Sequence, residues 1–190
     1  MLCSYILKKL KGGFLMTKDK RKIRNAKDVL AKYNLLRKLP IDVEYICKKE
    51  NIDIQIDDLA ELEEKYGYEV SGLISLDKEK GIRAIFVNQK DTIPRQKFTI
   101  AHELGHYFLH YEEAEDGEKD GAFISFRGSK GKKETEANKF ARDLLMPEEL
   151  VRAEHLKSFV PTSDYLANIF GVSVASMKIR LEELELDYVF

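Results

Sequence analysis

Two histidines stand four positions apart in the stretch FTIAHELGHYFLH, residues 98–110. Residues i and i+4 lie on one face of a helix, so His102 and His106 can offer ring nitrogens to the same ion. Glu103 falls on the flank of that face, where it can accept a proton from a water that zinc acidifies. This His-Glu-x-x-His spacing is typical of zinc peptidases.

The five-residue pattern alone leaves two interpretations open. Histidines at this spacing can also be buried, hydrogen-bonded residues of an amphipathic helix. Gly105 favours the metal site, because glycine costs about 1 kcal/mol relative to alanine inside a helix and so suggests that another backbone packs closely there. A catalytic zinc ion needs three protein ligands and one open position. The chain must therefore supply a third ligand.

The stretch ETEANKFARDLLMP, residues 134–147, is predicted to be the helix that supplies it. Glu134 lies near the edge of the apolar face of this helix, and Glu136 points away from it. A carboxylate on the buried side needs a partner. We therefore predict Glu134 as the third ligand and Glu136 as the alternative. The competing interpretation of Glu134 is a helix N-terminal charge that the macrodipole favours. Asn138 could hydrogen-bond a ligand histidine.

Other histidines and tyrosines are weaker candidates. His110 lies about 12 Å along the helix from His102, too far for both to bind one ion. We expect it to end the helix or to contact a ligand. His155, in the charged stretch RAEHLK, is expected to be solvated. Tyr107 and Tyr111 are possible donors to the oxyanion of peptide hydrolysis, although ordinary packing explains each of them as well.

The hydrophobic periodicity predicts an α+β fold, with a β-hairpin just before the histidine helix and additional helices toward the C-terminus. Residues 68–90 are predicted to form a β-hairpin, with Val70, Ile74 and Leu76 on one face and Gly72 between them. The charged, glycine-rich stretch that follows the histidine helix is expected to be a loop with a short strand at AFISF, residues 122–126. Helices are predicted within 24–36, 39–52, 94–110, 134–147, 147–159 and 162–184.

Length and composition set outer limits. The 190 residues are 44% hydrophobic and carry a net charge of −1, which suits a folded domain and gives no sign of the basic excess of nucleic-acid-binding proteins. Cys3 and Cys47 form no Cys-x-x-Cys pair, and no apolar run could span a bilayer, so a cytoplasmic protein without a membrane segment is expected.

We expect residues 1–20 to be a flexible or misannotated extension, 21–150 the core, and 151–190 a C-terminal helical segment.

The two motifs FTIAHELGHYFLH and ETEANKFARDLLMP together resemble the ImmA/IrrE family of metallopeptidases. The resemblance covers most of the chain. It implies a gluzincin-like core, a small sheet packed on the zinc-binding helix. It also implies one zinc ion held by His102, His106 and Glu134, with Glu103 as the general base. It also implies a bacterial or mobile-element protein that cleaves or inactivates helix-turn-helix repressors, an anti-repressor protease.

The C-terminal stretch YLANIFGVSVASMKIRL has the rhythm of a helix-turn-helix. DNA binding is not expected, because the acidic run of residues 182–187 follows the second helix and phosphate would repel it. The two alternatives for this segment are a packing role and a surface that docks a protein partner.

The rival hypothesis for the whole chain is a non-catalytic, metal-stabilised regulator that acts by binding protein or DNA. An intact Glu103 favours the enzyme, since a structural zinc site needs no base.

Overall fold

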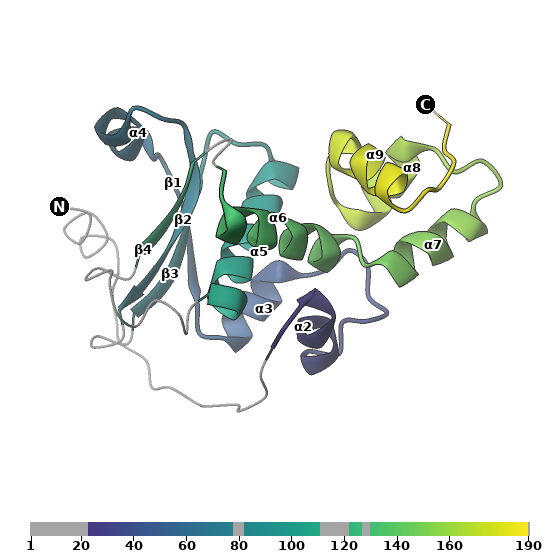
Figure 1. The fold of residues 1–190 in the computed structure, drawn as a ribbon, viewed down its shortest axis with the longest axis horizontal. Helices are drawn as coiled ribbons and strands as arrows, with labels where there is room; N and C mark the ends of the chain where they lie inside the picture. The colour runs from purple at the N-terminus through teal and green to yellow at the C-terminus, as the bar shows by residue number, and fades with distance from the viewer. Residues whose placement is uncertain (1–22, 78–81, 111–121, 127–129, 190) are drawn as a thin grey trace.

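The computed structural model describes residues 23–77, 82–110, 122–126 and 130–189. The predicted N-terminal extension and Tyr111 lie outside these residues. Four strands form one sheet in the order β1-β3-β2-β4 (Figure 1). β2 is antiparallel to both β3 and β4, and β1 is parallel to β3. The strands are β1 (Asp53–Asp57), β2 (Val70–Asp77), β3 (Ile82–Asn88) and β4 (Ala122–Phe126). The α+β class, the hairpin and the short strand at AFISF are confirmed.

Helices cover both faces of the sheet. On one face, Ile74 and Ile85 belong to the main hydrophobic core together with residues of α5 (Ile93–His110). On the other face, Leu73 and Phe86 pack with Leu62 of α4 (Ala60–Tyr66), which lies across the sheet from α5 (Figure 1). This arrangement buries the hairpin on both sides.

One detail of the predicted hairpin is wrong. Val70 packs with the α4 cluster, whereas Ile74 and Leu76 belong to the main core. The register of β2 against β4 shifts between Val70 and Gly72. Such a bulge interrupts the alternation of side chains, so Val70 leaves the face that simple alternation assigns to it.

Two helices carry the predicted site, α5 and α6 (Lys132–Leu145). α5 lies between the sheet and α6 (Figure 1). Gly72 brings α5 close to β2, because a Cβ there would lie 2.4 Å from Thr99 Cγ2 and 2.7 Å from the carbonyl oxygen of Phe86. α2 (Ala26–Lys32) and α3 (Val43–Lys49) pack against these two helices and begin at side-chain caps, Asn25 and Asp42.

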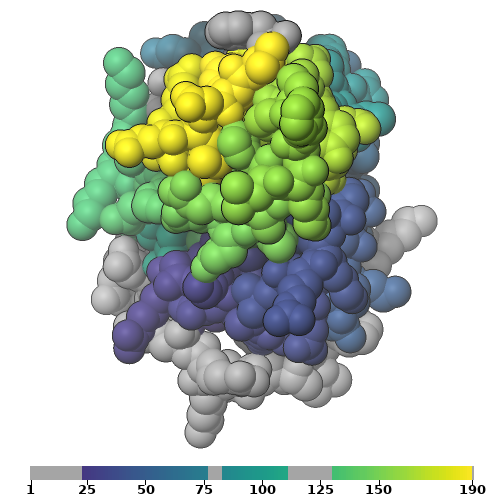
Figure 2. All heavy atoms as spheres, turned by 90° about the vertical axis from the view of Figure 1, so that its right-hand side faces the viewer, coloured from purple at the N-terminus to yellow at the C-terminus, as the bar shows by residue number. Residues whose placement is uncertain are grey.

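The chain ends in α7 (Glu148–Lys157), α8 (Ser163–Phe170) and α9 (Val174–Glu183). Gly171 ends α8 with a φ of 63°, a left-handed conformation that favours glycine, and Ser173 caps α9. The predicted helix, turn and helix are therefore present. Figure 2 shows these helices, green to yellow, above the purple and blue N-terminal helices. Within the described ranges, no helix has the length and apolar character that crossing a membrane requires.

Candidate metal centre

His102, His106 and Glu134 converge where α5 meets α6. The Nε2 atoms of the two histidines are 3.0 Å apart. Glu134 Oε2 is 3.3 Å from Nε2 of His102, and Glu134 Oε1 is 3.2 Å from Nε2 of His106. In the described part of the chain, these residues form the one group of three or more His, Cys, Asp or Glu side chains whose ligand atoms could hold a metal ion.

The spacing of these atoms suits zinc. Ligands about 2.0–2.1 Å from a tetrahedral zinc ion lie roughly 3.3 Å from one another. The two Nε2 atoms are 3.0 Å apart, and each lies 3.2 or 3.3 Å from one of the two carboxylate oxygens of Glu134, which is close to that value. Two imidazoles and one carboxylate are also a ligand set of catalytic zinc sites, and three protein ligands leave a fourth position open.

The electrostatics of the group favour a cation. Burial would raise the pKa of Glu134, but hydrogen bonds with His102 and His106 outweigh burial and hold that pKa well below its ordinary value. Burial would lower the pKa of His102, yet the hydrogen bond to Glu134 and the charge of Glu103 leave it raised. The carboxylates thus attract positive charge to the histidine pair.

Glu103 follows the first histidine on α5, and its side chain is fully buried. Burying a carboxylate is costly without a compensating charge or hydrogen bond. Its negative charge contributes to the raised pKa of His102, so Glu103 acts electrostatically on this group. Its place beside His102 is the one that the His-Glu-x-x-His pattern assigns to a general base.

Small residues allow α5 and α6 to approach closely. A Cβ on Gly105 would lie 3.0 Å from Cα and 3.1 Å from the carbonyl oxygen of Ala137. The predicted backbone contact opposite Gly105 is therefore present. The same approach brings Asn138 to the site, where its Oδ1 lies 3.0 Å from Nδ1 of His102. That contact fixes the ring of His102 with Nε2 directed to the ligand group.

Glu136, the alternative ligand, is not part of the group. Its Oε2 instead lies 3.0 Å from Nε2 of His110, and the Nδ1 of His110 lies 3.2 Å from Nδ1 of His106. His110 is almost fully buried, and burial holds its pKa below the ordinary value. His110 thus contacts His106, one of the two predicted ligand histidines. Its link to Glu136 was missed, because spacing along one helix does not reveal partners on another.

Tyr107 points its hydroxyl to other partners. The hydroxyl donates to Glu50 Oε2 at 3.0 Å and accepts from Arg83 at 2.9 Å. These contacts connect α5 with the end of α3 and with β3. They indicate that Tyr107 has a packing role and does not serve as an oxyanion donor. Glu50 and Arg83 are distant in sequence, so no local pattern indicates them.

His155 is not simply solvated, as the sequence suggested. It is half-buried, and its Nε2 donates to the carbonyl oxygen of Asp187 at 2.5 Å. The contact connects α7 with the segment after α9, and neither His155 nor Asp187 belongs to the ligand group.

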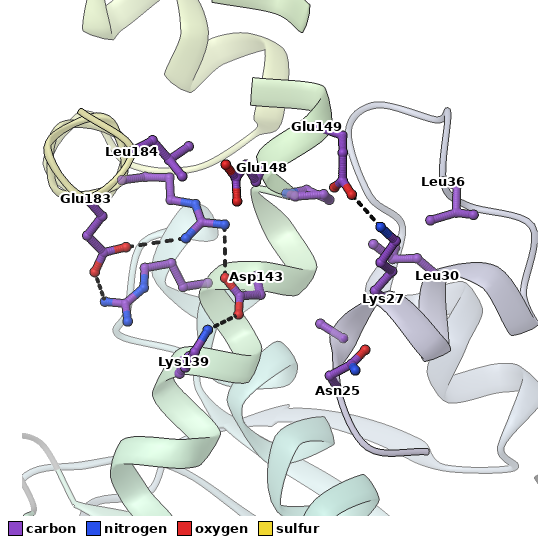
Figure 3. A pocket seen from close by; sticks show the side chains of 14 residues that line it. Asn25, Lys27, Leu30, Leu36, Lys139, Asp143, Glu148, Glu149, Glu183 and Leu184 are labelled. Atoms are coloured by element: carbon purple, nitrogen blue, oxygen red, sulfur yellow. Dashed lines mark hydrogen bonds and ion pairs between the residues drawn. The ribbon is translucent and has the colours of Figure 1, made fainter. Parts of the chain in front are cut away.

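A separate cavity of about 530 Å³ lies between α2, α6, α7 and α9 (Figure 3). None of the ligand-group residues lines it. Its charged side chains pair with one another, among them Lys27 with Glu149, Lys139 with Asp143, Arg142 with Glu183 and Arg180 with Asp143. This mutual pairing joins the helices that surround the cavity.

Comparisons with known proteins agree with the geometry. A search of curated proteins found no match. Residues 47–182, more than half of the chain, match the family of M78 peptidases described as the IrrE N-terminal-like domain. The match includes both site helices and most of the C-terminal segment. The chain therefore belongs to the ImmA/IrrE family of metallopeptidases, as the resemblance of its two motifs predicted.

Proposed function

We propose that the protein is a zinc-dependent endopeptidase. The observation that carries the proposal is the group of His102, His106 and Glu134, whose ligand atoms all lie within 4.8 Å of one another beside Glu103. Membership of a peptidase family supports peptide-bond hydrolysis as the reaction class. Three metal-binding side chains beside a carboxylate support a metal-assisted form of that reaction.

Each residue has a defined role in the proposed reaction. His102, His106 and Glu134 would hold the zinc ion and leave one position open. When bound, zinc acts as a Lewis acid that acidifies water and polarises a peptide carbonyl. Glu103 takes the proton of the attacking water and delivers it to the amine that leaves. Asn138 keeps the ring of His102 in the required orientation.

We propose a protein substrate of narrow range, a helix-turn-helix repressor, with the chain acting in the cytoplasm as an anti-repressor. The resemblance to the ImmA/IrrE family motivates this substrate. The low cysteine count favours a reducing compartment. DNA binding is not part of the proposal, because acidic residues follow α9 and would oppose a phosphate backbone.

The test compares wild type with Glu103→Gln, which keeps the size of the side chain and removes the base. Both proteins are loaded with zinc and incubated with lysate of the cell that encodes the chain, and new N-termini are identified by mass spectrometry. We expect cleavage of a repressor by wild type and a loss of at least about 100-fold in Glu103→Gln. Glu64→Gln, an exposed change on α4, serves as the control with full activity.

The rival function is a non-catalytic regulator that binds its partner through the C-terminal helices. The succession of α8, the turn at Gly171 and α9 keeps it as a second candidate. Suppose that both proteins bind zinc and that Glu103→Gln relieves repression as well as wild type does. That result would contradict the peptidase hypothesis and favour this regulator. Cleavage in a protein other than a repressor would retain the peptidase and replace only the substrate.

A further inference from the structure

The ring nitrogens of His102 and His106 that do not face the ligand group have different partners. Nδ1 of His102 lies 3.0 Å from the amide oxygen of Asn138, a common kind of acceptor. Nδ1 of His106 lies 3.2 Å from another imidazole nitrogen, Nδ1 of His110. An imidazole can donate or accept at either nitrogen, so this second contact works only if its protons are arranged correctly.

Metal binding at His106 would determine that arrangement. A neutral imidazole that gives its Nε2 lone pair to a metal carries its proton on Nδ1. His106 then donates to His110, whose Nδ1 must accept and whose proton must be on Nε2. That Nε2–H lies 3.0 Å from Glu136 Oε2, an acceptor. One proton arrangement therefore satisfies every contact from His106 to Glu136.

The burial of His106 and His110 favours this proton arrangement over contacts with water. His106 and His110 are only 1% and 2% exposed, so water cannot readily replace either partner. Glu136, in contrast, has a side chain that is 44% exposed and reaches inward from α6. Lys132, one turn earlier on α6, approaches the other carboxylate oxygen of Glu136 at 3.9 Å.

We propose that His110 and Glu136 are positioning residues, a relay that fixes the proton and ring orientation of His106 for metal binding. The inference rests on the proposed metal centre and extends it. α6 then holds both ligand histidines: Asn138 holds His102 directly, and Glu136 holds His106 through His110. Partners of this kind commonly change metal affinity by roughly 10- to 100-fold.

The test measures zinc affinity by competition with a chromogenic chelator, using full-length wild type, His110→Ala, Glu136→Ala and the double variant. We expect each single change to weaken binding roughly 10- to 100-fold. The double variant should bind about as weakly as His110→Ala, because Glu136 acts only through His110. Glu136 is partly exposed, so its variant should fold even if His110→Ala does not. His155→Ala and Glu64→Ala are the matched controls and should bind as wild type does.

A spectroscopic measurement separates the relay from a packing role. Zinc-loaded protein labelled with ¹⁵N-histidine has only four histidines, which simplifies assignment. His110 should carry its proton on Nε2, with Nδ1 unprotonated. Unchanged zinc affinity in Glu136→Ala, additive effects in the double variant, or a proton on Nδ1 of His110 would each overturn the relay. Failure of wild type to bind zinc at all would instead remove the proposed function, and the relay with it.

Discussion

At the scale of single residues, both ring nitrogens of His102 and of His106 have partners. His102 and His106 turn Nε2 to each other and to Glu134, while the Nδ1 atoms contact Asn138 and His110. A histidine held at one nitrogen has a fixed tautomer and ring orientation at the other, which lowers the cost of binding a metal.

Asn138 provides a direct check of this account. Asn138→Ala removes the acceptor for His102 Nδ1–H, and zinc affinity should fall roughly 10- to 100-fold. Asn138→Asp retains an acceptor and should remain close to wild type. Asn168→Ala, an exposed change on α8, is the control. The role assigned to Asn138 is wrong if Asn138→Ala and Asn168→Ala bind zinc equally well.

The grouping of His102, His106 and Glu134 in the candidate site could be predicted, and the reason is local. His102, Glu103 and His106 share one helical turn and its flank, and Glu134 was distinguished from Glu136 by its place at the edge of an apolar face. The contact of His110 with Glu136 joins two helices, as does that of Tyr107 with Glu50. Helical periodicity describes which residues share a face, but not which side chain on another helix meets them.

At the scale of elements, the approach of α5 to α6 determines whether Glu134 reaches the histidines. Gly105 was predicted to meet another backbone, and Ala137 does so. Two other elements, β1 and α4, were not predicted. β1 is a five-residue edge strand with a polar sequence, DIQID, and α4 has seven residues and lacks a side-chain cap. Short elements of this kind depend on the sheet they pack against, so their own residues indicate them weakly.

Gly105→Val tests the close approach. Its branched side chain would meet the backbone of Ala137, which cannot move as a flexible side chain can. We expect the free energy of unfolding to fall by about 1–3 kcal/mol, and zinc affinity to fall as Glu134 moves away. Glu64→Val, an exposed change on α4, is the control in urea denaturation. Equal stability of the two variants would contradict the proposed contact.

At the scale of the whole molecule, a polar network joins the elements around the site. Glu50, at the end of α3, accepts hydrogen bonds from Lys32, Tyr33 and Tyr107, and Arg83 of β3 donates to its backbone carbonyl. Burial would raise the pKa of Glu50, but the hydrogen bonds from Lys32 and Tyr33 outweigh burial and lower it. The network therefore stabilises the folded state when Glu50 is ionised.

The stability should consequently depend on pH in a defined direction. A folded-state pKa below the ordinary value of 4.5 gives stabilisation that is present above that pH and is lost as the pH falls through the folded value. Wild type should exceed Glu50→Gln in free energy of unfolding at pH 7, and the gap should narrow in more acidic solution. Denaturation in chelator excludes metal loss as the cause. A gap that stays constant or widens on acidification would show that the network does not act this way.

Metal content tests the central claim most directly. Wild type, His102→Ala, Glu134→Ala and Glu136→Ala would be purified without chelator, supplied with saturating zinc, freed of excess and analysed for bound zinc by mass spectrometry. We predict one zinc ion per chain in wild type and in Glu136→Ala, and none in His102→Ala or Glu134→Ala. Zinc retained in Glu134→Ala, or absent from wild type, would contradict the metal centre described above.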